Sequence, residues 1–475
     1  MNRFILKCTE CGSVFSEIPV LSRCPKCGGI VIYEYDYTSI TSFPSKDLGM
    51  WRYRSLFPIN NDIPPITLGE GNTGLRKAEN LGRLFNSKHL YIKDESKNPT
   101  GSFLDRGSSV LITFVKHGNI KVKKMILNGV GNLGASLSAY ASKAGIELNA
   151  YFSGFTDLGK LYQMIVYGAK LIPSTTKERE MVIPVIYNAY HVTSSDPIFA
   201  DGLKTTAYEI AEDLGWSEPD VIVLSTASGM HLSMIWKGFN ELRSLGLVKR
   251  GSVRLFGVQV EGCSEIANIY SRKYLNEIHD TPKKSAIPDL CVKKPAYLKL
   301  AIEAVRKSGG TFLIVNEHEI IDAIKLLARS EGIYAEPAAA CALAGLKKLY
   351  DEKIIDKDER AVYIVTGSGL KDVKFVERLI ESPKIKRLIR IRSIKQSGLG
   401  SVKNMILNLL KHKEMYGYEI WRELLDKGYK LTLPAVYQHL TELEEMGYII
   451  SRKVEIGGKL RRYYTLTGKT YSLQN

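Results

Sequence analysis

The chain has 475 residues, 44% of them hydrophobic and 24% charged, so it is long enough for two or three domains with cores of their own, and its composition excludes bulk disorder. The N-terminal apolar run has only three residues and no apolar stretch reaches membrane-spanning length, which excludes a signal peptide and predicts a soluble, cytoplasmic protein with no membrane partner. The formal net charge of +16 indicates either a polyanionic partner or a basic surface that serves solubility alone.

Four of the seven cysteines form two Cys-x-x-Cys pairs within the first thirty residues: Cys8, Cys11, Cys24 and Cys27. Four thiolates at this spacing can close tetrahedrally on one Zn²⁺ ion, so we predict a zinc ribbon over residues 1–35 with a structural metal site. Four free thiols or a redox pair are the alternative. The other three cysteines lack paired spacing, and we expect them to be small core residues: Cys263, Cys291 and Cys341.

Short β-branched runs alternate with helical patterns across residues 36–380, which we predict to be one α/β domain. The runs at 125–127, 221–224 and 361–365 are each followed by a turn rich in small residues. This order predicts α/β units on parallel sheets, with ligand sites at the carboxyl ends of the strands. Backbone amides at the starts of the following helices suit a phosphate.

Residues 93–107 read Lys-Asp-Glu-Ser-Lys-Asn-Pro-Thr-Gly-Ser-Phe-Leu-Asp-Arg-Gly, which resembles the cofactor-anchoring motif of threonine synthases. Other segments in the family's order are Gly69-Glu70-Gly71-Asn72-Thr73, Gly131-Asn132, Lys204-Thr205, Trp236-Lys237-Gly238, Glu336-Pro337-Ala338 and Thr366-Gly367. The resemblance covers about the first 380 residues. It implies a two-lobed, tryptophan-synthase-β-like parallel-sheet core and the pyridoxal-phosphate fold type II.

Leu104 occupies the position where the resemblance places the lysine that forms a Schiff base with pyridoxal phosphate. Leucine has no amine, so the covalent link cannot form there and pyridoxal phosphate can bind only non-covalently. One alternative is that Lys93 or Lys97 replaces that lysine. Another is that Leu104 is an engineered or erroneous change in a competent enzyme. We expect instead a pocket that binds an amino acid or phosphorylated amino acid without chemistry, and therefore no catalytic residue.

The resemblance also implies roles for single residues of the pocket. Asn132 matches the asparagine that contacts the phenolic oxygen of the cofactor, and Thr366 matches the residue that faces its pyridine nitrogen. The phosphate loop of the family matches residues 227–231, where Gly229 is the only glycine, so we expect an altered phosphate pocket. His231 is expected to be a turn or cap residue with no role in proton transfer.

We expect three further polar contacts to the ligand, from Ser102, Arg106 and Lys160. Arginine and lysine are the cations that hold a phosphate or carboxylate, the arginine in bidentate geometry. Lys204 is a further candidate, but a lone lysine usually lies in solvent, so we expect it on the surface.

The positive charge is concentrated near the C-terminus, since residues 384–475 carry 18 Lys and Arg against 8 Asp and Glu. Residues 381–401 read as a basic linker with a Gly- and Ser-containing break. Helical patterns follow at 402–411, 416–427 and 432–446, and then a hairpin pairs 448–455 with 459–466 across a Gly-Gly turn. Three helices and a basic hairpin predict a winged helix domain over 402–475. Its motifs Gly-Tyr-Glu-Ile at 417–420, Val-Tyr-x-x-Leu at 436–440 and Arg-Arg-Tyr-Tyr at 461–464 resemble those of PadR-like transcription regulators.

We predict that this domain binds double-stranded DNA, because a helix and a basic wing suit the major groove and the phosphates. Gln438 in the third helix can pair bidentately with adenine. Val436, Leu440 and Leu443 should face the core instead. A dimerisation or protein-docking module is the alternative. The residues expected to contact DNA are Tyr437, Gln438, His439, Arg452, Lys453, Lys459 and Arg461.

The sequence thus predicts a DNA-binding transcription regulator with a catalytically inactive, threonine synthase-like sensor domain. PadR-like proteins commonly dimerise through helices after the wing, whereas here Asn475 follows the wing closely. We therefore expect a homodimer through the large domain. The alternative function is an active threonine synthase, converting O-phosphohomoserine to threonine, with an appended autoregulatory DNA-binding domain.

Overall fold

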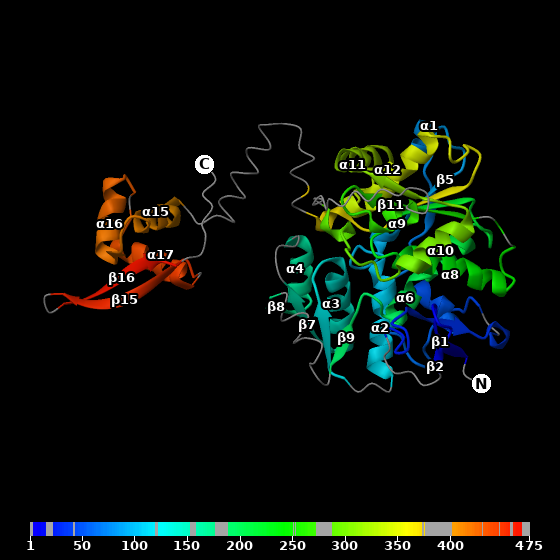
Figure 1. The fold of residues 1–475 in the computed structure, drawn as a ribbon, viewed down its shortest axis with the longest axis horizontal. Coiled ribbons are helices and arrows are strands. Elements are labelled where there is room, and N and C mark those ends of the chain that lie inside the picture. Colours follow the sequence, from blue (N-terminus) through cyan, green and yellow to red (C-terminus); the bar gives the residue numbers. More distant parts are fainter. Residues whose placement is uncertain are drawn as a thin grey trace. The chain divides into compact units, whose positions relative to one another are not determined.

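The computed structural model consists of two compact units, Met1–Leu379 and Ile380–Asn475 (Figure 1). It describes residues 3–15, 22–40, 43–118, 122–152, 158–175, 189–249, 251, 253–271, 287–372, 375, 401–429, 431–445, 447–456 and 459–467. The predicted basic linker, apart from its last residue, and the Gly-Gly turn of the hairpin lie outside the described residues.

The first unit begins with a three-stranded antiparallel sheet in the order β2-β1-β3. Leu6 pairs with both Phe15 and Tyr33, so one inward-facing position links the two flanking strands. Leu6, Val31 and Tyr33 are fully buried and belong to the main hydrophobic core of the unit. The three strands are β1 (Phe4–Cys8), β2 (Val14–Phe15) and β3 (Val31–Tyr35).

The larger lobe of this unit is built on a six-stranded sheet in the order β12-β11-β10-β13-β5-β4. All neighbours are parallel except the edge strand β4, which runs antiparallel to β5. β10 and β13 are buried along their whole length, as expected for central strands of a parallel sheet covered on both faces. The bounds are β4 (Leu75–Lys77), β5 (Leu90–Asp94), β10 (Val221–Ser225), β11 (Arg254–Val260), β12 (Phe312–Val315) and β13 (Ala361–Val365).

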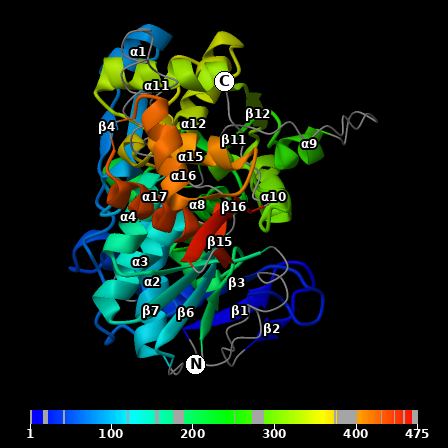
Figure 2. The same ribbon diagram turned by 90° about the vertical axis from the view of Figure 1, so that its left-hand side faces the viewer.

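The smaller lobe is built on a four-stranded parallel sheet in the order β8-β7-β6-β9. Figures 1 and 2 show this sheet in cyan to green, beside α2 and α3. Two parallel sheets with crossing helices confirm the predicted two-lobed α/β fold. The bounds are β6 (Lys124–Asn128), β7 (Glu147–Phe152), β8 (Lys170–Pro173) and β9 (Tyr190–Val192).

The helices of the first unit cover the two sheets and join them. α12 packs on the central strands of the large sheet, α3 packs on β7 of the small sheet, and α2 contacts both α3 and α6. The described helices are α1 (Glu79–Phe85), α2 (Leu104–His117), α3 (Asn132–Ala144), α4 (Leu158–Val166), α6 (Pro197–Leu203), α7 (Thr205–Asp213), α8 (Met230–Ser244), α9 (Glu265–Ser271), α10 (Leu298–Ser308), α11 (Glu317–Glu331) and α12 (Pro337–Asp351). The 3-10 turns are η1 (Tyr37–Ser39), η2 (Gly49–Leu56), η3 (Glu95–Lys97), η5 (Pro288–Leu290) and η6 (Gly369–Lys371).

The described part of the second unit contains three helices and a three-stranded antiparallel sheet in the order β14-β16-β15. Val436, Leu440 and Leu443 are fully buried in its own hydrophobic core, as their spacing on the third helix predicts. The short strand β14 was not predicted. The elements are α15 (Ser401–Leu410), β14 (Met415–Tyr416), α16 (Gly417–Asp426), α17 (Leu433–Glu445), β15 (Ile449–Ile456) and β16 (Lys459–Leu466).

Candidate functional site

A cavity of about 360 Å³ lies at the carboxyl ends of the parallel strands β10 and β13. The starts of α2, α3, α8 and α12 meet around it, so several helix N-termini face one space. This is where the α/β pattern predicts a ligand site. The described lining residues are Phe103, Leu104, Val130, Asn132, Leu133, Leu203, Ser225, Thr226, Ala227, Ser228, Gly229, Met230, His231, Pro288, Asp289, Leu290, Val292, Glu336, Ala338 and Thr366.

Leu104 is partly buried at the start of α2 and lines this cavity. Among the described lining residues there is no lysine. Lys93 is fully buried and donates to Glu209 at 2.9 Å, while Lys97 is exposed, and neither is a lining residue. The described part of the wall therefore offers no amine that could take the place of a Schiff-base lysine.

Within the described part of the chain, three polar atoms of the lining side chains are buried without a hydrogen-bond partner: Asn132 Oδ1, Thr226 Oγ1 and His231 Nδ1. Thr226 and His231 are only 3% and 6% exposed. A buried polar group without a partner is costly, so these three atoms are suited to hydrogen-bond a ligand. Asn132 also donates to Glu336 Oε2 at 2.9 Å, and Thr366 Oγ1 lies 3.5 Å from Ser225 Oγ.

The loop at residues 227–231 contains a tight turn at Gly229. Gly229 has φ +85°, and a Cβ there would lie 2.9 Å from the Cβ of Ala301 and 3.0 Å from the carbonyl oxygen of Tyr297. Only glycine fits this approach between α8 and α10. Met230, at the first helical position, is buried and lines the cavity.

His231 lies in the first turn of α8, and its ring stacks on Phe103 with centroids 4.2 Å apart. Its Nε2 is 3.1 Å from Thr206 Oγ1. Burial lowers the pKa of His231 to about 3, so the ring is neutral at pH 7. It contributes hydrogen-bonding capacity to the cavity and no positive charge.

Arg106 does not line the cavity, although we expected it to contact the ligand. It is fully buried and binds two carboxylates, Glu95 at 2.6 and 2.8 Å and Glu209 at 2.7 and 3.0 Å. Thr205 Oγ1 lies 3.1 Å from its Nη1. Burial disfavours the charged guanidinium, but Glu209 and Glu95 outweigh this and raise the pKa of Arg106. Its described contacts thus join α2, η3 and α7.

Lys160 also lies behind the cavity wall. It pairs with Asp289, and its Nζ lies 4.0 Å from Glu336 and 3.8 Å from Asp372. Burial disfavours the ammonium, but these carboxylates, Glu336 first, outweigh it and raise the pKa of Lys160. Two of its three partners, Asp289 and Glu336, line the cavity, so this polar cluster presents carboxylates to the ligand space.

Ser102 and Lys204 are the remaining candidate contacts, and neither lines the described cavity. Ser102 is buried in a bridge with Gly367. The expectation that Lys204 lies on the surface is wrong: it is fully buried, and it pairs with Asp201 at 2.8 Å and Glu241 at 3.3 Å. These acids lie on neighbouring helices, and only Asp201, three residues earlier on α6, could have been found from spacing.

Cys263 is a core residue and Cys291 packs against the same core, as expected, but the bond between them was not predicted. Cys263 and Cys291 form a disulfide with a Cα–Cα distance of 4.9 Å, at a sequence separation of 28. Nothing in that spacing indicates a pair, because the fold brings the end of β11 beside η5. Cys341 is a free, fully buried core residue, as expected.

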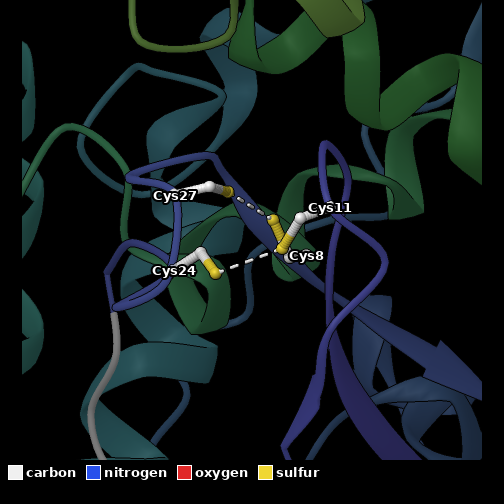
Figure 3. A group of neighbouring side chains, drawn as sticks. All are labelled: Cys8, Cys11, Cys24 and Cys27. Atoms are coloured by element: carbon white, nitrogen blue, oxygen red, sulfur yellow. Dashed lines mark hydrogen bonds between the residues drawn. The ribbon is translucent and has the colours of Figure 1, made fainter.

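The four N-terminal cysteines converge from two loops (Figure 3). Their sulfur atoms all lie within 4.8 Å of one another, with 3.5 Å between Cys8 and Cys27 and 3.6 Å between Cys11 and Cys24. Metal–sulfur bonds of about 2.3 Å in a tetrahedron place the sulfurs about 3.8 Å apart. The cluster is therefore a possible site for one metal ion with four thiolate ligands.

The second unit presents a candidate DNA-contacting face on α17 and the wing. Tyr437 and Gln438 are exposed, and the Tyr437 ring occupies the space beside Gly417, where a Cβ would lie 2.5 Å from it. His439 is half-buried, with Nδ1 3.7 Å from Glu442. This close packing of α16 on α17 explains the glycine of the Gly-Tyr-Glu-Ile motif.

On the wing, Arg452 and Lys453 are exposed in β15, and Arg452 pairs with Glu414. The Arg461 guanidinium lies 4.7 Å from the ring centroid of Tyr416. Lys459 pairs in register with Ile456, and its side chain is outside the described ones. The described wing therefore presents two exposed cations, Arg452 and Lys453, and a third, Arg461, that lies over an aromatic ring.

Two acidic side chains of the cavity, Asp289 and Glu336, were not predicted. Glu336 belongs to the segment Glu336-Pro337-Ala338, which resembles threonine synthases, so the sequence could have indicated it as a site residue. Asp289 lies in no such segment, so the sequence did not point to it.

Among the described residues, no helix is long and apolar enough to cross a membrane.

The first unit has two lobes on parallel sheets and a cavity at strand ends of the larger sheet, which is the pyridoxal-phosphate fold type II. The second unit has the winged helix fold of a transcription regulator. Residues 66–367 match the family described as "Pyridoxal-phosphate dependent enzyme", and residues 406–470 match the "Transcriptional regulator PadR-like family". The chain belongs to the pyridoxal-phosphate-dependent enzyme family, with threonine synthases as homologues, and carries a PadR-like domain at its C-terminal end. The predicted fusion is confirmed.

Among the relatives, the threonine synthase of Methanocaldococcus jannaschii is 34% identical over 389 residues, which cover 79% of this chain and 95% of the relative. That of Methanosarcina acetivorans is 35% identical over 395 residues, covering 80% and 95%. Among solved structures, the processed threonine deaminase isoform 2 of Solanum lycopersicum aligns with a TM-score of 0.54 at 16% identity, over 65% of this chain and 88% of that one. An aspartate racemase gives 0.53 at 19% identity, over 62% and 90%.

Replacing Arg106 tests its structural role. Arg106→Met should lower the free energy of unfolding of the first unit by about 3–5 kcal/mol, because two buried carboxylates lose a partner. Calorimetry on the full chain measures this. The control, Lys347→Ala, breaks an exposed ion pair with Asp351 and should change the free energy of unfolding by under about 1 kcal/mol. Equal, small effects of the two variants would show that the cluster is not structural.

Proposed function

We propose that this protein is a DNA-binding transcription regulator whose threonine synthase-like domain senses a ligand without catalysing a reaction. The observation that carries the proposal is Leu104, which lies in the wall of the cavity where the resemblance places the Schiff-base lysine. The described part of that wall supplies no other lysine. A domain that keeps its cavity but lacks the reactive amine is suited to binding alone.

Pyridoxal phosphate, when bound, supplies an electron sink for carbanions on an amino-acid substrate. The cavity fits this group in part: the unpartnered Asn132 Oδ1, the Thr366 hydroxyl and the turn at Gly229 would hold a pyridine ring and its substituents. It lacks an amine for the aldehyde, and no described lining residue is a cation that would meet a phosphate. We therefore infer that any pyridoxal phosphate binds non-covalently.

We infer that the ligand is a free amino acid rather than a phosphorylated one. The carboxylates of Asp289, Glu336 and Asp372 surround the Lys160 ammonium, and the buried Lys371 interacts with Glu336 and Asp289 as well. Three carboxylates thus face two lysines, which leaves negative charge in excess at the polar end of the cavity. An ammonium group is attracted to this end and a phosphate dianion is repelled. Apolar side chains such as Leu104 and Leu133 form another part of the wall and suit an aliphatic side chain.

Ligand binding would be transmitted to DNA as a shift between conformations of the two lobes. The cavity has walls from both lobes, since α3 belongs to the small sheet while Thr226 and Thr366 follow strands of the large one. A ligand that prefers one arrangement of the lobes shifts the population toward it. In a homodimer formed through residues before 380, this shift would change the spacing of two winged helices on a palindromic site.

An active threonine synthase with an autoregulatory DNA-binding domain is the second candidate function, and Lys371 is the observation that favours it. This lysine is 4% exposed, and its Nζ has no hydrogen-bond partner among the residues that the structure describes. Burial lowers its pKa, which favours the neutral amine that Schiff-base chemistry requires. Lys371 is not a described lining residue of the cavity, so this candidate requires its side chain to be redirected.

Treatment with pyridoxal phosphate and borohydride separates the two candidates. The wild-type protein should yield no labelled peptide from the cavity, whereas Leu104→Lys should acquire one reduced adduct per chain at residue 104, because it restores the amine. Peptide mapping by mass spectrometry measures both. A stoichiometric adduct at Lys371 in the wild-type protein, lost in Lys371→Met, would instead support the enzyme.

Thermal shift with L-threonine and O-phospho-L-threonine tests the ligand class, since the two compounds differ only by the phosphate. At about 100 times its Kd, L-threonine should stabilise the first unit by about 2.7 kcal/mol, and the phosphorylated compound should stabilise it less. In Asp289→Asn this preference should shrink. A larger effect of the phosphorylated compound would contradict the inferred ligand class.

DNA binding is tested with fragments from upstream of its own gene by fluorescence anisotropy. Arg452→Ala and Lys453→Ala should weaken binding on every sequence and each reduce the salt slope by about 1, because they remove phosphate contacts. Gln438→Ala should cost about 1–3 kcal/mol at one base pair only. Lys347→Ala, which removes a positive charge from the first unit, is the control. Equal effects of all four variants would contradict the proposed interface.

We propose that the four-cysteine cluster holds a structural Zn²⁺ ion, because four thiolates leave no open coordination position. Elemental analysis should find one zinc per chain in the wild-type protein and in Cys341→Ser. Cys24→Ser should contain none and should melt at a lower temperature, because Cys24 is a buried member of the core that the ribbon strands share. Full zinc content in Cys24→Ser would contradict the assignment.

A further inference from the structure

The disulfide between Cys263 and Cys291 connects the large sheet to a wall of the cavity. Cys263 follows β11, where its backbone N–H donates to the carbonyl of Val260 at 3.0 Å. Cys291 directly follows η5, and both neighbouring residues, Leu290 and Val292, line the cavity. The bond therefore fixes one end of a cavity wall to a rigid strand.

The segment 287–292 contacts both lobes. Ile287 and Leu290 are buried in the core of the large lobe together with Cys263. Asp289 reaches across and pairs with Lys160 on α4, which packs on the small lobe. A change in this segment therefore acts on the cavity wall and on the contact between the lobes together.

The disulfide is a main anchor of this segment. The recorded backbone hydrogen bonds of Leu290 and Cys291 run to the carbonyls of Ile287 and Pro288, which lie within the segment itself. The described contacts that tie the segment to the rest include apolar burial, the Asp289–Lys160 pair and the Cys263–Cys291 bond. Breaking the covalent one should raise the rate at which the segment opens.

We propose that Cys263 and Cys291 are a redox-reversible pair that controls how firmly segment 287–292 closes the cavity. The physiological meaning rests on the proposed function: DNA is bound in a compartment where thiols are kept reduced, and in mesophiles the disulfides that form there are usually transient and catalytic or redox-sensing. In its reduced form the wall opens more readily, and in its oxidised form it holds the bound ligand.

The pair can form by exchange with a low-molecular-weight disulfide such as oxidised glutathione. The Cys291 thiolate, the more exposed of the two, attacks one glutathione sulfur and releases one glutathione thiolate. The Cys263 thiolate then attacks Sγ of Cys291 and releases the second. The two cysteine thiols are oxidised by two electrons and oxidised glutathione is reduced, and the two cysteine protons pass by way of solvent to the released thiolates, which become two glutathione thiols.

The test uses the full, zinc-containing chain equilibrated in glutathione buffers of different oxidised-to-reduced ratio. Non-reducing peptide mapping should show the Cys263–Cys291 cross-link rising with that ratio. Hydrogen exchange at the amides of Leu290 to Val292 should be on the order of 10-fold faster in the reduced protein. These readouts need neither ligand nor DNA, so they stand even if the proposed function fails.

Variants control for general effects of thiol chemistry. Cys291→Ser should show fast exchange in every buffer, and Cys341→Ser, which removes a buried free thiol, should respond as the wild-type protein does. If Cys291→Ser does not fold, the wild-type comparison between buffers still decides. The proposal is overturned if no cross-link forms in the oxidising buffer, or if exchange at 290–292 is the same in both states.

Discussion

The buried ion cluster around Arg106 holds together the elements beside the cavity. Arg106 on α2 forms ion pairs with Glu95 and Glu209, and Lys93 on β5 forms an ion pair with Glu209 as well. Two cations therefore neutralise two carboxylates away from water, which is the condition under which buried charges are tolerated. The cluster fixes the start of α2 against β5 and α7, and the cavity is bounded by that same helix start.

The cluster also explains how the domain keeps its fold when residue 104 is a leucine. On a helix, positions two apart point about 200° away from each other, so Leu104 faces the cavity while Arg106 faces the interior. Leu104 and Arg106, the one in the cavity wall and the other in the ion cluster, are thus on opposite sides of one helix turn. Under the proposed function, the amine was dispensable for the scaffold, and only the chemistry depended on it.

Local features were predictable from the sequence, and contacts between distant segments were not. The spacing of Val436, Leu440 and Leu443 placed them correctly in the winged helix core, and the strand and turn patterns indicated where the cavity lies. Arg106 and Lys160 were expected at the ligand because arginine and lysine usually bind anions in such motifs. Their partners Glu209 and Asp289 lie 103 and 129 residues away in the chain, so no spacing rule could connect them. The same reason hid the disulfide.

The two terminal parts of the protein differ in how separable they are. The winged helix has a hydrophobic core of its own, whereas Leu6, Val31 and Tyr33 of the N-terminal ribbon pack within the core of the large unit. Tyr35 also donates a hydrogen bond to Asp201, and its ring lies 4.1 Å from the Lys204 ammonium. The winged helix can therefore be joined to another protein or lost as a separate module. The N-terminal sheet β2-β1-β3 has to be inherited together with the large unit, because it completes the core of that unit.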